Sequence, residues 1–164
     1  LEKLVLKTPS NINNLLLLGK SYQNLEHYTK AIATYKKVLA IDSKDKDGLV
    51  ETAACYSSLN QIENAQSYIC RALSRYPNYN MAIWIKGEII EKIAGSKLDK
   101  NGNVSYEGKF IYEFALDTFK RLINDPQMGK NANSRVRYLQ QFIRTKEDKF
   151  MHKTDAEPTF DFGC

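Results

Sequence analysis

Hydrophobic residues recur at helical spacing through most of the chain. Within residues 13–24, Leu15, Leu18 and Tyr22 are separated by three or four positions. Within residues 28–41 the same spacing recurs, at Ile32, Tyr35, Val38 and Leu39. This spacing places the apolar side chains on one face of an α-helix. The pattern therefore predicts consecutive amphipathic helices, each of which buries one face.

The pattern repeats with a regular period of about 34 residues. Small residues mark it at Gly19, Ala53 and Gly87, and larger residues mark it at Tyr22, Tyr56 and Ile90. The small residues let the two helices of a unit approach closely, and the larger residues fill the space between units. Because one such unit cannot bury its apolar face alone, neighbouring units must stack on one another.

This unit resembles the tetratricopeptide repeat, whose pattern is W-x2-L-G-x2-Y…A-x3-F…P. The first unit matches it at Leu18, Gly19, Tyr22 and Ala31. The opening Trp is absent, and its place is taken by Leu15, Leu49 and Ile83. The Leu before the small residue is replaced by Thr52 and Lys86 in the second and third units. The resemblance covers most of the chain from residue 1 to about residue 125.

The resemblance implies an all-α solenoid of antiparallel helix pairs. It divides the chain into three units, at residues 11–44, 45–78 and 79–126. Residues 1–10 resemble the end of a preceding repeat, with Leu1, Leu4, Val5 and Pro9 at places equivalent to Ile69, Ala72, Leu73 and Pro77. Solenoids need polar caps, so we expect a fragment of a longer array that begins inside a second helix. The alternative is a short N-terminal cap helix at residues 1–7.

The third unit is interrupted at residues 95–107. Residues 80–94 have the pattern of a first helix, but the pattern of its partner begins only at residue 110. The dipeptide Asn101-Gly102 lies at the centre of the insert and suits a type I′ turn, because both residues tolerate positive φ. We therefore expect a small β-hairpin that projects from the solenoid.

A calcium loop is the alternative for the same insert. Asp99, Asn101 and Asn103 are spaced like the first ligands of an EF-hand. However, Val104 replaces the Gly of the sharp turn, and Phe110 replaces the bidentate Glu. The hairpin is the better interpretation.

The remaining segment has the pattern of one amphipathic helix at residues 131–151. Its apolar stripe consists of Val136, Leu139, Phe142 and Ile143. We expect this helix to cap the last repeat and residues 154–164 to form a flexible tail.

Composition excludes several classes of protein. Hydrophobic residues make up 43% and charged residues 26% of the 164 residues, which excludes a wholly disordered chain. The longest apolar run, at residues 15–18, is far shorter than the roughly 20 residues of a membrane span. The net charge of +5 is spread over both halves of the chain, so we expect no nucleic-acid partner. Binding of RNA or an anionic membrane remains an alternative, through Arg135, Arg137, Arg144, Lys146 and Lys149.

No pattern of catalytic residues is present. The only histidines, His27 and His152, lie far apart in the chain, and no hydrolase, metalloprotease or nucleotide-binding motif occurs. Asp161-Phe162-Gly163 spells the kinase metal-binding triplet, but the other kinase motifs are missing. We predict a non-enzyme without cofactor or metal.

The cysteines say little about function. Cys55, Cys70 and Cys164 are too few and too scattered for a disulfide framework or a metal site. Cys55 and Cys70 fall on the two helices of one repeat, where buried thiols are a better interpretation than a redox pair. This usage slightly favours the cytoplasm, and a bacterial periplasm stays possible.

In tetratricopeptide-repeat proteins the first helices line a concave groove that receives an extended peptide or a partner helix. Carried over by position, the groove residues would be Asn13, Leu16, Lys20, Gln23, Val50, Ala54, Ser57, Met81, Trp84 and Glu88. Leu16, Val50 and Trp84 are each one repeat period apart and are expected to form an apolar stripe. Trp84 would anchor the partner, so Trp84→Ala should weaken binding by about 2 kcal/mol. The alternative is that Trp84 fills the core.

A chaperone-type carboxylate clamp is not expected. The resemblance implies a clamp of Lys, Asn and Arg side chains, but only Lys20 could serve here. The other clamp places hold Leu16, Glu51, Met81 and Ile85. We therefore predict an interaction scaffold that binds a largely apolar peptide or amphipathic helix. The alternative is a structural subunit of a larger complex, such as an oligomer or a bacterial envelope complex, that uses the solenoid edges rather than the groove.

Overall fold

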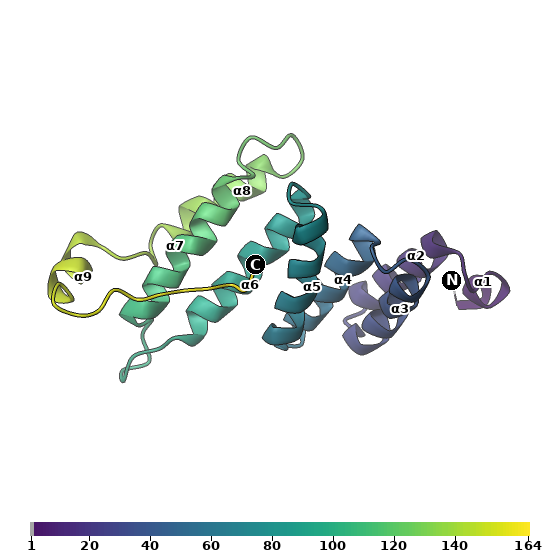
Figure 1. Ribbon diagram of the computed structural model, residues 1–164, viewed down its shortest axis with the longest axis horizontal. Helices are drawn as coiled ribbons and strands as arrows, with labels where there is room; N and C mark the ends of the chain where they lie inside the picture. The colour runs from purple at the N-terminus through teal and green to yellow at the C-terminus, as the bar shows by residue number, and fades with distance from the viewer. Residues whose placement is uncertain (1) are drawn as a thin grey trace. The chain divides into compact units, whose positions relative to one another are not determined.

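The computed structural model describes residues 2–164, apart from the side chain of Leu4. Leu1, which the repeat comparison placed in an earlier helix, lies outside the described residues. The described residues form helices joined by turns and loops, without strands, and group into two compact units that divide between Ala82 and Ile83 (Figure 1).

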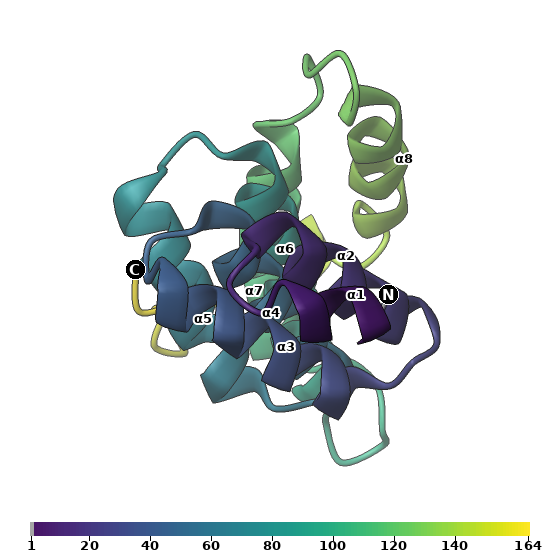
Figure 2. The same cartoon turned by 90° about the vertical axis from the view of Figure 1, so that its right-hand side faces the viewer.

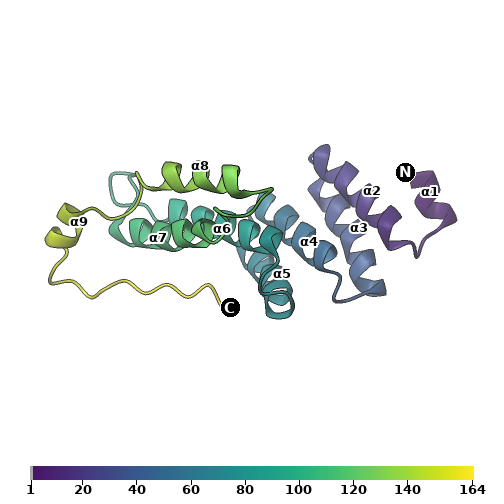
Figure 3. The same cartoon turned by 90° about the horizontal axis from the view of Figure 1, so that it is seen from above.

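The first unit consists of helices that pack pairwise in chain order. They are α1 Glu2–Lys7, α2 Ile12–Asn24, α3 Tyr28–Ile41, α4 Lys46–Ser58 and α5 Ile62–Arg75, followed by the start of α6 Asn80–Ser96. Helix α2 lies beside α3 (Figure 3), and α4 packs against α5. The short helix α1 packs against α2 (Figure 2). The expected antiparallel helix pairs are confirmed.

Capping residues fix where the first helix of each pair begins. The Asn11 side chain accepts the Asn14 backbone N–H at 3.1 Å, and Asp45 accepts the Gly48 N–H at 2.6 Å. Each satisfies a backbone donor that the first turn of a helix leaves free. Each first helix is followed by a residue with positive φ, Glu26 at 59° and its counterpart Asn60 at 57°. The chain reverses there into the second helix.

The core of the first unit forms where a small residue faces a large one. A Cβ atom added to Gly19 would collide with the fully buried Tyr35 ring, so α2 and α3 can approach closely only because the residue is Gly. Around this contact the interior is filled by fully buried side chains, among them Leu15, Val38, Leu49 and Ile69.

The second unit has the same kind of contact. It contains the rest of α6, α7 Tyr106–Lys120, α8 Gly129–Leu139 and α9 Lys146–Met151. A Cβ on Gly87 would lie 2.6 Å from the Phe119 ring, so α6 and α7 meet as α2 and α3 do. The insert between α6 and α7 lengthens the connection without changing this contact.

The insert is hairpin-like, as expected, but its turn is not of type I′. A single antiparallel bridge joins Leu98 to Val104. Gly102 has a φ of 81°, whereas Asn101 is not among the residues with positive φ, so a type I′ turn is not formed. The reason is that the Asp99 carboxylate accepts the backbone N–H groups of Asn101 and Asn103, at 2.8 and 3.0 Å. These bonds fold the loop around Asp99.

The prediction of a single C-terminal helix at residues 131–151 is wrong. The segment forms two helices, α8 and α9, with a turn between them. Arg144 lies in that turn, where its buried guanidinium donates to both carboxylate oxygens of Glu113, at 2.8 and 2.9 Å. Thr145 then caps α9 in a reciprocal pair with Asp148. Burying Arg144 against α7 interrupts the helix.

The tail predicted to be flexible packs against the second unit instead (Figure 1). Phe162 is 7% exposed, and the Phe160 ring meets the Phe114 ring edge-on with 5.3 Å between centroids. The Lys86 ammonium donates to the Cys164 carbonyl at 3.0 Å. Aromatic burial therefore orders a segment that has no helical pattern of its own.

Candidate protein-interaction site

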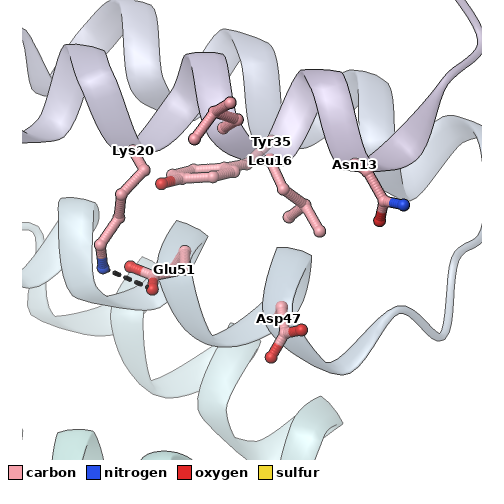
Figure 4. Close-up of a pocket in the computed structure, with 7 residues that line it drawn as sticks. Asn13, Leu16, Lys20, Tyr35, Asp47 and Glu51 are labelled. Atoms are coloured by element: carbon pink, nitrogen blue, oxygen red, sulfur yellow. Dashed lines mark hydrogen bonds and ion pairs between the residues drawn. The ribbon is translucent and has the colours of Figure 1, made fainter.

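A hollow opens in the first unit where the inner faces of α2 and α4 meet (Figure 4). Its volume is about 310 Å³. Seven residues line it, namely Asn13, Leu16, Leu17, Lys20, Tyr35, Asp47 and Glu51. It is therefore built from the first helices of two successive repeats, with one side chain from α3 between them.

Helical spacing explains why these side chains converge. Asn13, Leu16 and Lys20 are three and four positions apart, so they share one face of α2. Asp47 and Glu51 are four apart on α4 and face them across the hollow (Figure 4). The Glu51 carboxylate of α4 and the Lys20 ammonium of α2 are thereby brought together.

The floor of the hollow is rigid and aromatic. Tyr35 is fully buried, and its hydroxyl donates to the Gln23 side chain at 2.9 Å. Burial raises the pKa of Tyr35, and the nearby charge of Glu51 raises it further, so the hydroxyl stays neutral. Leu16 is half-buried beside this ring, and Leu17 is 54% exposed. The hollow thus offers accessible aliphatic surface on a fixed base.

The α4 side of the hollow is acidic, and the Lys20 side chain reaches it from α2. The Lys20 ammonium lies 2.7 Å from the Glu51 carboxylate, and both side chains remain partly exposed. The Tyr79 hydroxyl donates to Asp47. Burial raises the pKa of Tyr79, and the hydrogen bond to Asp47 and the charges of Asp47, Glu51 and Asp45 raise it further. With two carboxylates, Asp47 and Glu51, and one ammonium, Lys20, this side of the hollow carries more negative than positive charge.

The structure brings some of the expected groove residues together and buries others. Asn13, Leu16 and Lys20 line the hollow, and Gln23 lies behind it as the acceptor of the Tyr35 hydroxyl. In the second repeat Ala54 is half-buried, whereas Val50 and Ser57 are buried, with Val50 only 1% exposed. A buried Val50 contributes packing rather than contact area, so it does not continue the apolar stripe expected from Leu16.

The third-repeat residues lie on α6. Met81 is exposed, and Trp84 is half-buried with its ring edge-on to Phe119 at 5.0 Å between centroids. The Trp84 indole N–H donates to Glu88 at 2.9 Å. Burial raises the pKa of Glu88, although the indole and the charges of Arg135 and Lys92 act to lower it. Much of the Trp84 side chain is thus used within the second unit.

Leu17, Tyr35 and Asp47 line the hollow but were not among the predicted groove residues. Glu51 was named only as the residue at one place of the carboxylate clamp. Asp47 lies one repeat period after Asn13, so the periodicity already pointed to it. Glu51 follows one helical turn later. The predicted groove residues included polar positions of α2, but on α4 they were Val50, Ala54 and Ser57, so the acidic side of the hollow was not predicted.

Two of the cations considered for RNA or membrane binding are engaged within the second unit. Arg135 donates to both carboxylate oxygens of Glu91, at 2.7 and 2.5 Å. Arg144 is paired with Glu113 and Glu157. These pairs neutralise much of the charge that an anionic surface would need.

Other kinds of site are not found in the part of the chain that the structure describes. Within residues 2–164, no three His, Cys, Asp or Glu side chains are grouped so that they could hold a metal ion. Nor does any helix of these residues have the length and apolar character that crossing a membrane requires.

Two comparisons with known proteins find similarity. A family model described as "Tetratricopeptide repeat" matches residues 12–45 and 52–79. Two solved structures of MamA resemble the chain, each with a TM-score of 0.56. The first is 17% identical over 96% of this chain and 84% of that one, and the second is 18% identical over 94% and 87%. No curated protein matches the sequence.

At these identities the likeness to MamA shows the fold alone. The family match agrees with the helix pairs α2–α3 and α4–α5. Tetratricopeptide repeats are typically non-enzymatic protein-interaction modules, which supports a general role as an interaction scaffold. This chain is therefore an all-helical protein that carries tetratricopeptide repeats at residues 12–45 and 52–79.

Proposed function

We propose that the chain is an interaction scaffold that binds a polypeptide segment of a partner protein at the hollow between α2 and α4. The proposal rests on one observation: an open hollow of about 310 Å³ lies between the first helices of two successive repeats. Such a volume lies at the lower limit of ligand pockets and accommodates a few side chains rather than a large cofactor.

The surface of the hollow is suited to a peptide. The exposed Leu17 and the half-buried Leu16 supply aliphatic area, and Asn13, Lys20 and Glu51 supply polar groups around it. An apolar centre with a polar rim is the usual composition of a protein interface. The rigid Tyr35 floor reduces the ordering that binding would otherwise require. We propose that Met81, an exposed residue of α6 in the same unit, offers further contact.

A peptide-display selection tests this proposal. Random nonapeptides are selected on the wild-type protein, and the affinity of enriched peptides is then measured for two matched variants. Leu17→Asp places a charge in the hollow, whereas Ala33→Asp places the same charge on an exposed position of α3. Leu17 is chosen because its exposure makes the substitution compatible with folding, which the melting temperature verifies.

We expect Leu17→Asp to weaken binding at least about tenfold, because it charges the centre of an apolar contact. Ala33→Asp should bind like the wild type. If the selected peptides bind Leu17→Asp as tightly as the wild type, the hollow is not the binding site.

Assembly into a larger complex is a second candidate, favoured by the surface of α1. Val5 is buried against Leu15, Leu18 and Val38, but Leu6 on the other side of this short helix is 80% exposed. In such an assembly Leu6 would contact another subunit. In this arrangement the edge of the first unit, rather than the hollow, would make the interface.

A further inference from the structure

The charges that face the hollow do not balance. Asp47 and Glu51 contribute two carboxylates, and Lys20 contributes one ammonium. Glu51 is paired with Lys20 at 2.7 Å, whereas Asp47 accepts a hydrogen bond from a neutral group, the Tyr79 hydroxyl. The hollow therefore has an excess of negative charge on its α4 side.

The surroundings of Asp47 add to this negative potential. Asp45, at the N-cap of α4, acts on the same Tyr79 hydroxyl as Asp47 and Glu51 do. The Lys46 ammonium lies over the Tyr79 ring, 4.9 Å from its centroid. The three carboxylates of Asp45, Asp47 and Glu51 still outnumber the two ammonium groups of Lys20 and Lys46. The whole chain has a net charge of +5, so this hollow is a local negative site on a positive protein.

We infer that the hollow receives a lysine or arginine side chain of the partner peptide, next to an aliphatic residue that packs on Leu16 and Leu17. The inference rests on the proposed function and specifies its partner. A long basic side chain fits both parts of the hollow, because its methylene groups can lie on leucine surface while its charged end reaches Asp47.

A peptide cation suits this hollow better than a metal ion does. The hollow offers two carboxylates, one of which is already paired with Lys20, and a metal site needs more ligands than remain. The overall positive charge of the protein would repel most basic segments. The carboxylates of the hollow would therefore determine which residue of a bound peptide lies in the hollow.

The test repeats the display selection with a charge-reversed bait. Peptides enriched on the wild-type protein should pair Lys or Arg with a neighbouring Leu, Ile or Met. Peptides enriched on Asp47→Lys should lose that preference and gain Asp or Glu. The matched control is Glu63→Lys, which makes the same charge change at an exposed position of α5. It should enrich the same peptides as the wild type.

A direct affinity measurement follows on one wild-type-selected peptide. Replacing its Lys or Arg by norleucine should weaken binding to the wild type about fivefold. The same replacement should have almost no effect on binding to Asp47→Asn, which keeps an oxygen acceptor for the Tyr79 hydroxyl. The advantage of the cation should shrink as salt concentration rises.

The possible results distinguish failure of the inference from failure of the proposed function. Selected peptides without a basic residue, whose binding depends on Leu17, would overturn the inference and leave the hollow as the binding site. Selected basic peptides that respond equally to Glu63→Lys and Asp47→Lys would also overturn it. Failure to select any Leu17-dependent peptide would overturn both the inference and the proposed function.

Discussion

Single residues decide how closely the helices of a repeat approach. Gly19 faces Tyr35 in the first unit and Gly87 faces Phe119 in the second, and in each case a Cβ atom would overlap the ring. The repeat period identified the small residues from the sequence. It also places Asp47 one period after Asn13, but an acidic side chain at that position looks like any solvated surface residue until α2 is placed opposite it.

Gly87→Ala is expected to destabilise the protein, although Ala is the better helix former. Ala gains about 1 kcal/mol in helix propensity, and overpacking against a buried ring costs about 1–3 kcal/mol. We expect a net loss of about 1 kcal/mol in the free energy of unfolding, measured by chemical denaturation. The double variant Gly87→Ala/Phe119→Leu should recover part of that loss. A more stable Gly87→Ala protein would show that the helices are not in close contact.

Cys55 is expected to be unreactive in the folded protein. Its thiol is buried, and burial raises its pKa to about 12, with the charge of Glu51 also raising it and Lys20 acting in the opposite direction. Since the thiolate is the reactive form, alkylation at pH 8 should be negligible until the protein unfolds. Iodoacetamide labelling followed by mass spectrometry of the Cys55 peptide measures this. Equal labelling in native buffer and in guanidinium chloride would contradict the described burial.

Among the elements, the C-terminal helices differ most from what periodicity predicts. The spacing of Val136, Leu139 and Phe142 favours one continuous helix, but Arg144 is buried against Glu113 and breaks it. A basic residue in an amphipathic pattern is normally assigned to the solvent face. Its partner lies far earlier in the chain, on α7, and is revealed only by tertiary structure.

The N-terminus of α9 is expected to make stability pH-dependent. Burial acts to raise the pKa of Asp148, but the Lys109 ammonium at 2.7 Å and the Thr145 backbone N–H and hydroxyl outweigh it, and the pKa lies at about 2. The unfolded pKa is about 3.9, so the carboxylate stabilises the fold above about pH 4 and loses this effect as the pH falls toward 2.

The stability contributed by Asp148 should be about 1 kcal/mol at neutral pH, since the side chain is only partly buried. The measurement is the free energy of unfolding between pH 5 and pH 2. The difference between wild type and Asp148→Asn should disappear at the acidic end. Glu147→Gln, at an exposed neighbouring position, should follow the wild type throughout. A difference that stays constant with pH would exclude the ionised pair.

For the molecule as a whole, the sequence predicts the architecture better than the binding surface. The repeat period is sufficient to predict helix pairs and their stacking, because both depend on which positions are apolar. The exposure of an individual position depends on everything that packs against it. Leu16 and Val50 occupy equivalent places in the repeat, yet Leu16 lines the hollow and Val50 is buried.

Self-association through α1 has its own expected result. If Leu6 makes a subunit contact, light scattering over about a hundredfold range of concentration should show a mass that rises for the wild type. Leu6→Lys should then remain monomeric with an unchanged melting temperature, because Leu6 is already exposed. A wild-type mass that stays monomeric throughout would remove self-association through α1.

The central claim is that a partner segment binds between α2 and α4. The most direct measurement is a methyl NMR titration of the protein with a display-selected peptide. We predict that the methyl signals of Leu16 and Leu17 shift on binding, whereas those of Leu6 and Ala33 do not. Saturable binding that leaves Leu16 and Leu17 unchanged and shifts other methyl groups would contradict the claim.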